Sequence, residues 1–227
     1  MDGVGAVILA AGSSRRMNGI NKIFMPVEGR PLISWTVDAF ERSPHVDRIS
    51  LVFSDETIEN GRKLVEHEQW KKVRAVTKGY GRRQDSAREG LIALGECEIV
   101  LIHDGARACV TDDIIGRAVD AARRHGAAAA AVRVTDTIKD VGDDGIVTRT
   151  HDRNRLWAMQ TPQAFRYEII TEAHSRIKDD VTDDTSMVEM LGHKVAVFEG
   201  SYSNIKITTP DDIERVSNAI RSLHGTR

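Results

Sequence analysis

The chain has 227 residues and a formal net charge of −2, from 32 lysines and arginines against 34 aspartates and glutamates. This length suits one large α/β domain over residues 1–227, and the balanced charge argues against a nucleic-acid partner. No stretch approaches the ~20 apolar residues of a membrane span, and no secretory signal is expected at the first residues. Because Cys97 and Cys109 have no C-x-x-C partner, we expect a reducing cytoplasm, with neither a disulfide scaffold nor a zinc site.

Apolar runs alternate with amphipathic segments along the chain, an order typical of a parallel sheet covered by helices on both faces. The expected strands are residues 6–10, 48–53, 72–77, 99–103, 127–134, 195–198 and 205–208. Asp85 or Ser86 is the expected cap of a helix that ends at Leu94, and residues 209–212, with the sequence TPDD, predict another helix start. The pattern therefore predicts an α/β fold with a Rossmann-like, mostly parallel sheet.

Residues 135–152 break this alternation and predict a projecting β-hairpin arm. Two strand-like segments, 135–141 and 146–151, flank the turn-rich tetrad GDDG at 142–145. The arm carries few large apolar side chains, and an isolated polar hairpin cannot stabilise itself in water. We therefore expect it to lie against another subunit, although a loose surface excursion is the alternative.

The first expected strand runs into small residues and then into clustered positive charge, with the sequence AAGSSRRM at 10–17 and Lys22 shortly after. Small residues let backbone N–H groups approach a polyphosphate, and the cations supply charge where the phosphorus reacts. The loop is neither a Walker loop nor a G-x-G-x-x-G fingerprint, and a glycine turn with solvated arginines is the alternative. The residues expected to act here are Ala10, Ala11, Gly12, Ser13, Ser14, Arg16 and Lys22.

Further polar clusters follow the later strands, and functional loops of doubly wound sheets gather beyond the carboxyl ends of their strands. They are the turn GYGRRQDS at 79–86, HDGAR at 103–107, Arg153, QTPQ at 160–163, TDD at 182–184 and NIKIT at 204–208. Each cluster alone is weak evidence, but together they predict one site at a single edge of the sheet.

In this joint order the chain resembles the sugar-phosphate nucleotidyltransferases and, from end to end, the 2-C-methyl-D-erythritol 4-phosphate cytidylyltransferase family. The matching segments are AAGSSRRM, GRRQDS, HDGAR, DRNRLW, QTPQAF, VTDDTSMVE and NIKITTPDD. The resemblance implies transfer of a cytidylyl group from CTP to a polyol phosphate with release of pyrophosphate, a Mg²⁺ requirement, and a homodimer joined by the arm. The chain departs from the family pattern at Tyr80, usually glycine, at Gly105, usually alanine, and at Ala108, usually proline.

The acceptor phosphate is already an ionised nucleophile at pH 7, so the chemistry needs cations that position two anions rather than a general base. Arg16 and Lys22 suit stabilisation of the pentacoordinate phosphorus. The resemblance implies that Arg153 and Lys206 hold the acceptor phosphate. Expected CTP contacts beyond the first loop are Gly79, Gly81, Arg83 and Ser86, and expected acceptor contacts are Asp104, Arg107, Thr137, Thr161 and Thr182.

Several alternatives stay open from the sequence. Asp104 is expected to contact either the acceptor hydroxyls or Mg²⁺, unless it only caps the following turn, and His103 is expected to be structural. Ribitol-5-phosphate cytidylyltransferase is the nearest alternative function, and an inactive nucleotide-binding regulator is an alternative of another class. A nicotinamide-dependent oxidoreductase is disfavoured by the missing fingerprint.

Overall fold

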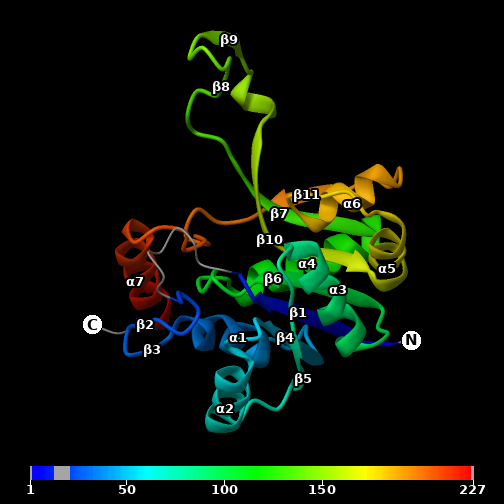
Figure 1. Ribbon diagram of the computed structural model, residues 1–227, viewed down its shortest axis with the longest axis vertical. Helices are drawn as coiled ribbons and strands as arrows, with labels where there is room; N and C mark the ends of the chain where they lie inside the picture. The colour runs from blue at the N-terminus through cyan, green and yellow to red at the C-terminus, as the bar shows by residue number, and fades with distance from the viewer. Residues whose placement is uncertain (1, 13–20, 226–227) are drawn as a thin grey trace.

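A seven-stranded sheet forms the centre of the computed structural model, which describes residues 2–12 and 21–225 (Figure 1). The strands are β1 (Val4–Ala10), β4 (Arg48–Phe53), β5 (Val73–Lys78), β6 (Ile99–Asp104), β7 (Ala127–Arg133), β10 (Trp157–Arg166) and β11 (Ala196–Glu199). Their order in the sheet is β11-β7-β10-β6-β1-β4-β5. Only β10 runs antiparallel to its neighbours β6 and β7 among these pairs, so the predicted mostly parallel sheet is confirmed.

Helices pack on both faces of the sheet because alternate residues of the buried strands point to opposite sides. Ala6 and Ile8 of β1 belong to one apolar cluster, with α1, α4 and α7, whereas Val7 belongs to a second, with α3, α5 and α6. The helices are α1 (Leu32–Arg42), α2 (Ile58–Glu68), α3 (Arg83–Leu94), α4 (Asp112–His125), α5 (Tyr167–Arg176), α6 (Asp184–Met190) and α7 (Asp211–His224). None of these helices, within the part of the chain that the structure describes, has the length and apolar character that a membrane crossing requires.

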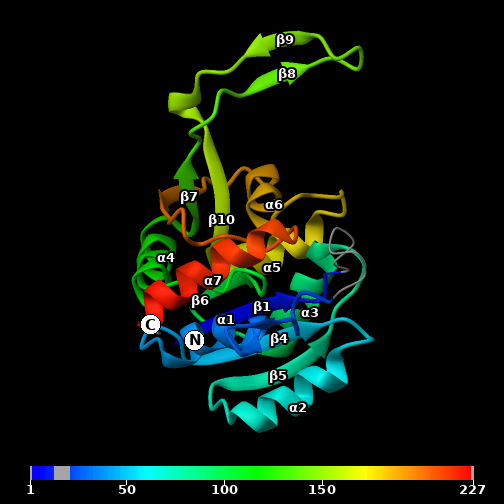
Figure 2. The ribbon, with the colours of Figure 1, turned by 90° about the vertical axis from the view of Figure 1, so that its left-hand side faces the viewer.

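The polar hairpin predicted from the sequence projects from the end of β7 and the start of β10 (Figures 1 and 2). It consists of β8 (Lys139–Val141) and β9 (Val147–Thr150), and every residue of both strands is exposed. The turn between them is closed by a hydrogen bond from the Gly142 N–H to the Ile146 carbonyl at 2.9 Å. The arm therefore has no packing partner within residues 2–12 and 21–225 of its own chain.

Three expectations about secondary structure were wrong. Residues 205–208 form no strand; instead the Ile207 N–H donates to the Ala106 carbonyl at 3.0 Å, which holds this extended segment beside the end of β6. Helix α3 begins at Arg83, so neither Asp85 nor Ser86 caps it. The long strand β10 was missed because its buried residues include the polar Gln160, Thr161 and Gln163, which hide the apolar alternation.

Two short strands, β2 (Pro26–Val27) and β3 (Arg30–Pro31), form a tight hairpin before α1. Its turn residues Glu28 and Gly29 have φ values of 48° and 77°, in the left-handed region. This hairpin leads the chain from Lys22 back into the helical layer.

Candidate active site

A cavity of about 340 Å³ lies where β1, β5 and β6 end, at the edge of the sheet at which the sequence predicted a site. Its lining combines apolar residues, small residues and cations. The lining residues are Leu9, Ala11, Gly12, Lys22, Ile23, Tyr80, Gly81, Arg83, Ser86, Asp104, Ala106, Lys206 and Thr208. The structure thus brings together eight of the residues predicted to bind or act on substrate, namely Ala11, Gly12, Lys22, Gly81, Arg83, Ser86, Asp104 and Lys206.

Asp104 is the carboxylate of this cavity, and three cations surround it. Its Oδ2 lies 2.7 Å from Lys206 Nζ and 3.8 Å from Arg107 Nε, and its Oδ1 lies 3.3 Å from Arg83 Nε. Burial alone would raise the pKa of Asp104, but the charges of Arg83, Lys206 and Arg107 lower the pKa well below its usual range. Asp104 is therefore ionised at neutral pH and fixes the positions of the cations around it.

Arg83 links the cavity to a buried carboxylate behind it. One guanidinium nitrogen, Nε, pairs with Asp104, and another, Nη1, pairs with Asp184 of α6. Burial alone would lower the pKa of Arg83, but the two carboxylates raise it, so the guanidinium is a fixed positive charge. Among the described residues nothing accepts a hydrogen bond from the buried Arg83 Nη2.

The turn between β5 and α3 is held rigid by Ser86. Its hydroxyl accepts a hydrogen bond from the Tyr80 N–H at 2.9 Å and lies 3.1 Å from the Tyr80 carbonyl oxygen. A Cβ atom placed on Gly79 would lie 2.7 Å from Ser86 Oγ, so only glycine fits this close approach. Tyr80 itself has no positive φ and its side chain is 52% exposed, so tyrosine is accommodated here without backbone strain.

The two lysines of the cavity come from distant segments that contact each other. Lys22 Nζ donates to the Ile207 carbonyl at 2.8 Å, which connects the first loop to the segment that carries Lys206. Asp212 holds the far end of the same segment, because its carboxylate accepts hydrogen bonds from the Thr208 and Thr209 N–H groups at 2.8 and 2.9 Å. Asp212, in the first turn of α7, thus holds the segment that carries Lys206.

His103 and Thr161 support Asp104 from inside the protein. The Thr161 hydroxyl accepts a hydrogen bond from the Asp104 N–H at 3.1 Å and contacts His103 Nδ1, also at 3.1 Å. Burial lowers the pKa of His103 to about 4, so its ring is neutral at pH 7. His103 is buried and bonds to its own chain at both ring nitrogens, which agrees with the structural role expected for it.

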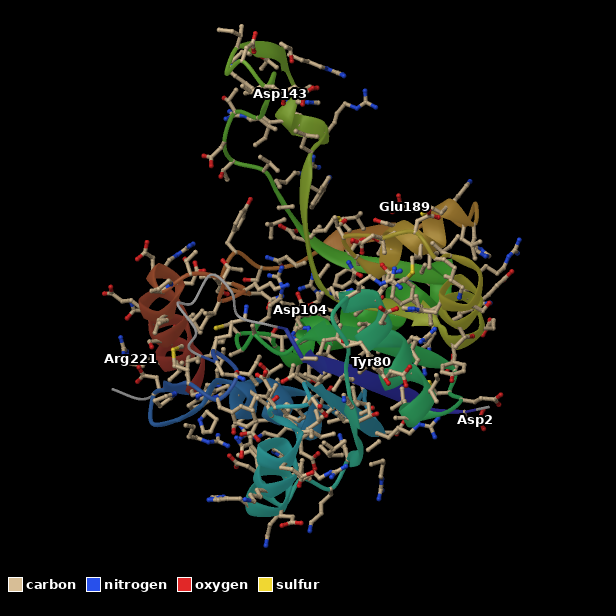
Figure 3. All side chains as sticks on the ribbon, viewed as in Figure 1. Asp2, Tyr80, Asp104, Asp143, Glu189 and Arg221 are labelled. Carbon is tan, nitrogen blue, oxygen red and sulfur yellow. The ribbon has the colours of Figure 1, made fainter. Side chains whose placement is uncertain are left out.

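Several predicted contact residues do not line the cavity of their own chain. Ala10 is buried in β1 and Gly79 is buried in the turn. Thr161 is buried and Arg107 is half-buried, and both contact Asp104. Thr182 is exposed beside α6, where it lines a separate cavity. Thr137 and Arg153 are exposed on the arm, and Figure 3 shows the arm reaching away from Asp104, with Asp143 at its far end. The predicted contacts Ser13, Ser14 and Arg16 lie outside the described residues.

Sequence reasoning missed Asp184 and Asp212, two carboxylates that hold site residues in place. Both sit in aspartate pairs at helix starts, Asp183-Asp184 and Asp211-Asp212, where acidic residues are common for reasons of capping alone. The signal available in the sequence was the second aspartate of each pair, because a helix start needs only one cap; Asp184 pairs with Arg83, and Asp212 binds the Thr208 N–H.

No group of three or more histidine, cysteine, aspartate or glutamate side chains that would bind a metal is found among residues 2–12 and 21–225. Mg²⁺ in nucleotide enzymes needs fewer protein ligands, because one or two carboxylates suffice when phosphates and water complete its shell. Asp104 meets this requirement, since a carboxylate has about four lone-pair positions and its three cationic neighbours leave room for one more.

A cavity lined by cations and one buried carboxylate, at the carboxyl edge of a mostly parallel sheet, is an arrangement that suits an α/β nucleotidyltransferase. The family model of 2-C-methyl-D-erythritol 4-phosphate cytidylyltransferase matches residues 4–222. The chain belongs to this family.

Relatives and solved structures agree with this assignment. The chain is 47% identical over 210 residues, 92% of both chains, to a protein of Dehalococcoides mccartyi named 2-C-methyl-D-erythritol 4-phosphate cytidylyltransferase. It is 42% identical over 217 residues to the protein of that name from Clostridium perfringens, which covers 94% of this chain and 96% of the relative. The crystal structure of 4-diphosphocytidyl-2C-methyl-D-erythritol synthase from Anaerococcus prevotii superposes with a TM-score of 0.85 at 33% identity, covering 97% of this chain and 96% of that one.

Proposed function

We propose that this chain transfers the cytidylyl group of CTP to 2-C-methyl-D-erythritol 4-phosphate, giving 4-diphosphocytidyl-2-C-methyl-D-erythritol and pyrophosphate for isoprenoid synthesis. The observation that carries the proposal is the set of cations Lys22, Arg83 and Lys206 in one cavity, where Arg83 and Lys206 pair with Asp104. Such a site binds two anionic substrates and offers no general base, which matches a nucleophile that is already ionised.

In this reaction an oxygen of the acceptor phosphate forms a bond to the α-phosphorus of CTP, and the bond from that phosphorus to the pyrophosphate oxygen breaks. No proton has to move. Lys22, together with Arg16 of the same loop, stabilises the extra negative charge on the α-phosphoryl oxygens. Lys206 and Arg153 hold the acceptor phosphate in line for attack. The proposed triphosphate contacts are Ala10, Ala11, Gly12, Ser13 and Ser14.

The turn that Ser86 holds, with Gly79, Gly81 and Arg83, is proposed to read the cytosine base and the ribose. Cytosine presents an N4 amino donor where uracil presents an acceptor, so a fixed backbone carbonyl separates the two bases. Asp104 is proposed to accept hydrogen bonds from acceptor hydroxyls, with Arg107, Thr137, Thr161 and Thr182 as further acceptor contacts. Asp104 is also the residue that would hold Mg²⁺, which would neutralise phosphate charge when bound.

We further propose that the chain forms a homodimer in which the arm of each subunit reaches the site of its partner. Ile138, Val141, Ile146 and Val147 of the arm are exposed apolar side chains. At the base of the arm, the Arg153 guanidinium donates to the Thr135 carbonyl at 2.9 Å. A partner surface would cover the apolar residues and bring Arg153 and Thr137 to an acceptor. We place the reaction in the cytoplasm, where the buried free Cys97 and Cys109 stay reduced.

The test is pyrophosphate release from CTP, measured side by side with 2-C-methyl-D-erythritol 4-phosphate, with ribitol 5-phosphate and with no acceptor. The proposal requires kcat/KM to be highest with 2-C-methyl-D-erythritol 4-phosphate and release without acceptor to be negligible. A higher kcat/KM with ribitol 5-phosphate would show that the chain is a ribitol-5-phosphate cytidylyltransferase instead. If no pyrophosphate were released with either acceptor, the remaining alternative would be an inactive nucleotide-binding regulator.

A further inference from the structure

Behind the proposed nucleotide cavity the structure contains a row of three side chains that lie close to one another, Arg83, Asp184 and His174. Arg83 lines the cavity and pairs with Asp184 at the start of α6. The other carboxylate oxygen of Asp184, Oδ1, lies 3.2 Å from His174 Nε2 of α5. Asp184 and His174 line no part of the cavity, and the Asp184 side chain is completely buried.

A fully buried carboxylate is costly unless charged or polar neighbours compensate it. A merely structural pair would be enclosed within the fold, but here one partner of the pair, Arg83, lines the cavity. The three nitrogens of the Arg83 guanidinium have different surroundings: Nε faces Asp104, Nη1 faces Asp184, and Nη2 is buried without an acceptor among the described residues. Two carboxylates thus fix the plane of the guanidinium, and the Arg83 side chain, 22% exposed, lines the cavity.

We infer that Asp184 is a positioning residue for the transfer reaction: it fixes the Arg83 guanidinium at the wall of the cavity, where Arg83 contacts the bound cytidine nucleotide, and His174 lies against Asp184 on the side away from the cavity. Arginine presents its donors in a rigid fork, so fixing two nitrogens also fixes the direction of the third. Because the long Arg83 side chain is already ordered in the free protein, binding of CTP does not have to restrict it, and the entropic cost of binding is smaller. This inference rests on the proposed function, because it assigns the nucleotide as the ligand of Arg83.

The neighbouring Asp183 provides a matched control within the same helix start. Its carboxylate caps α6 by accepting from the Ser186 N–H at 3.0 Å, and it also binds Gln163 and Thr185 at 2.7 Å. An Asp183→Asn change therefore weakens α6 without touching Arg83. An Asp184→Asn change keeps the shape of the side chain but removes the charge that holds Arg83.

The experiment measures KM for CTP and KM for 2-C-methyl-D-erythritol 4-phosphate in Asp184→Asn, Asp183→Asn and the unmodified protein, with thermal unfolding as a stability readout. We expect Asp184→Asn to raise the CTP KM about tenfold or more, the scale of one charge-assisted hydrogen bond, while the acceptor KM changes less than twofold. Asp183→Asn should lower the unfolding temperature but leave the CTP KM within twofold. Equal rises in both KM values, or the same CTP effect from Asp183→Asn, would overturn the inference.

A double-mutant cycle with Arg83→Met separates positioning from stability. If Asp184 acts through Arg83, adding Asp184→Asn to Arg83→Met changes the CTP KM less than twofold, and additive effects would contradict this. Should Asp184→Asn fail to fold, His174→Gln carries the test with an expected two- to fivefold rise in the CTP KM alone, and an unchanged value would count against the inference. If the unmodified protein itself showed no cytidylyl transfer from CTP, that result would refute the proposed function rather than this inference.

Discussion

The Lys206 ammonium lies 2.7 Å from the Asp104 carboxylate, which brings a cation from the segment before α7 to the end of strand β6. The Lys206 side chain is 36% exposed, so one side of its ammonium faces the cavity while the other is paired. This pairing orients the charge before any anion arrives, and preorganised charge is the main contribution that a site without a base makes to catalysis.

Lys206→Ala should therefore lower kcat roughly 10²-fold or more, the scale of losing one preorganised charge stabiliser. Lys78→Ala is the matched control, because Lys78 Nζ also pairs with an aspartate, Asp55, at 2.8 Å, but lies outside the cavity lining. Steady-state kinetics at saturating substrates measures both. A kcat for Lys206→Ala within twofold of the control would remove Lys206 from the proposed mechanism.

Base selection should depend on the backbone of the turn that Ser86 holds. We expect CTP to exceed UTP in kcat/KM by at least ~10²-fold, because the wrong base leaves buried polar groups unpaired. Ser86→Ala removes the hydroxyl that holds the Tyr80 N–H and should reduce this preference at least tenfold. Tyr80→Ala keeps that backbone contact and should change the preference less than threefold. Equal use of CTP and UTP by the unmodified protein would refute cytidylyl specificity.

The Asp212 carboxylate should contribute to stability in a pH-dependent way. Burial alone would raise its pKa, but the hydrogen bonds from Thr208 and Thr209 lower the pKa to about 2. A lowered pKa means that the contribution is present above the unfolded value of 3.8 and is lost as the pH falls from 3.8 towards 2. Asp212→Asn should thus reduce the free energy of unfolding by about 1–2 kcal/mol at pH 7 and by less at pH 3.

Urea denaturation of both proteins at pH 7 and pH 3 measures this difference. Asp211→Asn is the control, because Asp211 is exposed and its carboxylate does not hold the Lys206 segment. A deficit of Asp212→Asn that is as large at pH 3 as at pH 7 would contradict the assigned role of its charge.

Arg153 should act on the site of the partner subunit, because it lies at the base of an arm that projects away from the central sheet of its own chain (Figure 2). If so, mixing Lys206→Ala with Arg153→Ala under subunit exchange yields about half heterodimers, each with one intact site, so activity should recover to about a quarter of the unmodified level. A mixture of Lys206→Ala with the double variant Lys206→Ala/Arg153→Ala has no intact site and should not recover. Mixed dimers in native mass spectrometry without recovered activity would place Arg153 in its own chain's site.

The fold was largely predictable because its strands are short apolar runs between recognisable helices. Residues 48–53, for example, were predicted and observed with the same bounds. Strand β10 was not predictable, since its buried Gln160 and Gln163 are satisfied by tertiary hydrogen bonds to Ser201 and Asp183 that no local pattern reveals. The segment at 205–208 has strand-like alternation, but its backbone contacts the Ala106 carbonyl rather than a neighbouring strand.

Site residues that follow strand ends could be predicted from the sequence. Residues that act only by positioning another side chain were harder to predict. Lys22, Arg83, Asp104 and Lys206 were expected together, and the structure gathers them. The support that Asp184 gives Arg83 depends on packing of α6 against the sheet, which spacing in the sequence does not encode. The role of Arg153 stays a prediction, because it depends on the proposed second subunit.

The most direct test of the central claim follows the phosphorus atoms of CTP labelled with ³²P, in separate reactions at the α or the γ position, with 2-C-methyl-D-erythritol 4-phosphate as acceptor. Attack at the α-phosphorus predicts that the α label appears in the cytidine diphosphate–polyol product and the γ label appears in pyrophosphate, both only when acceptor is present. An α label recovered in CMP, or a γ label recovered in the polyol product, would contradict cytidylyl transfer at this site.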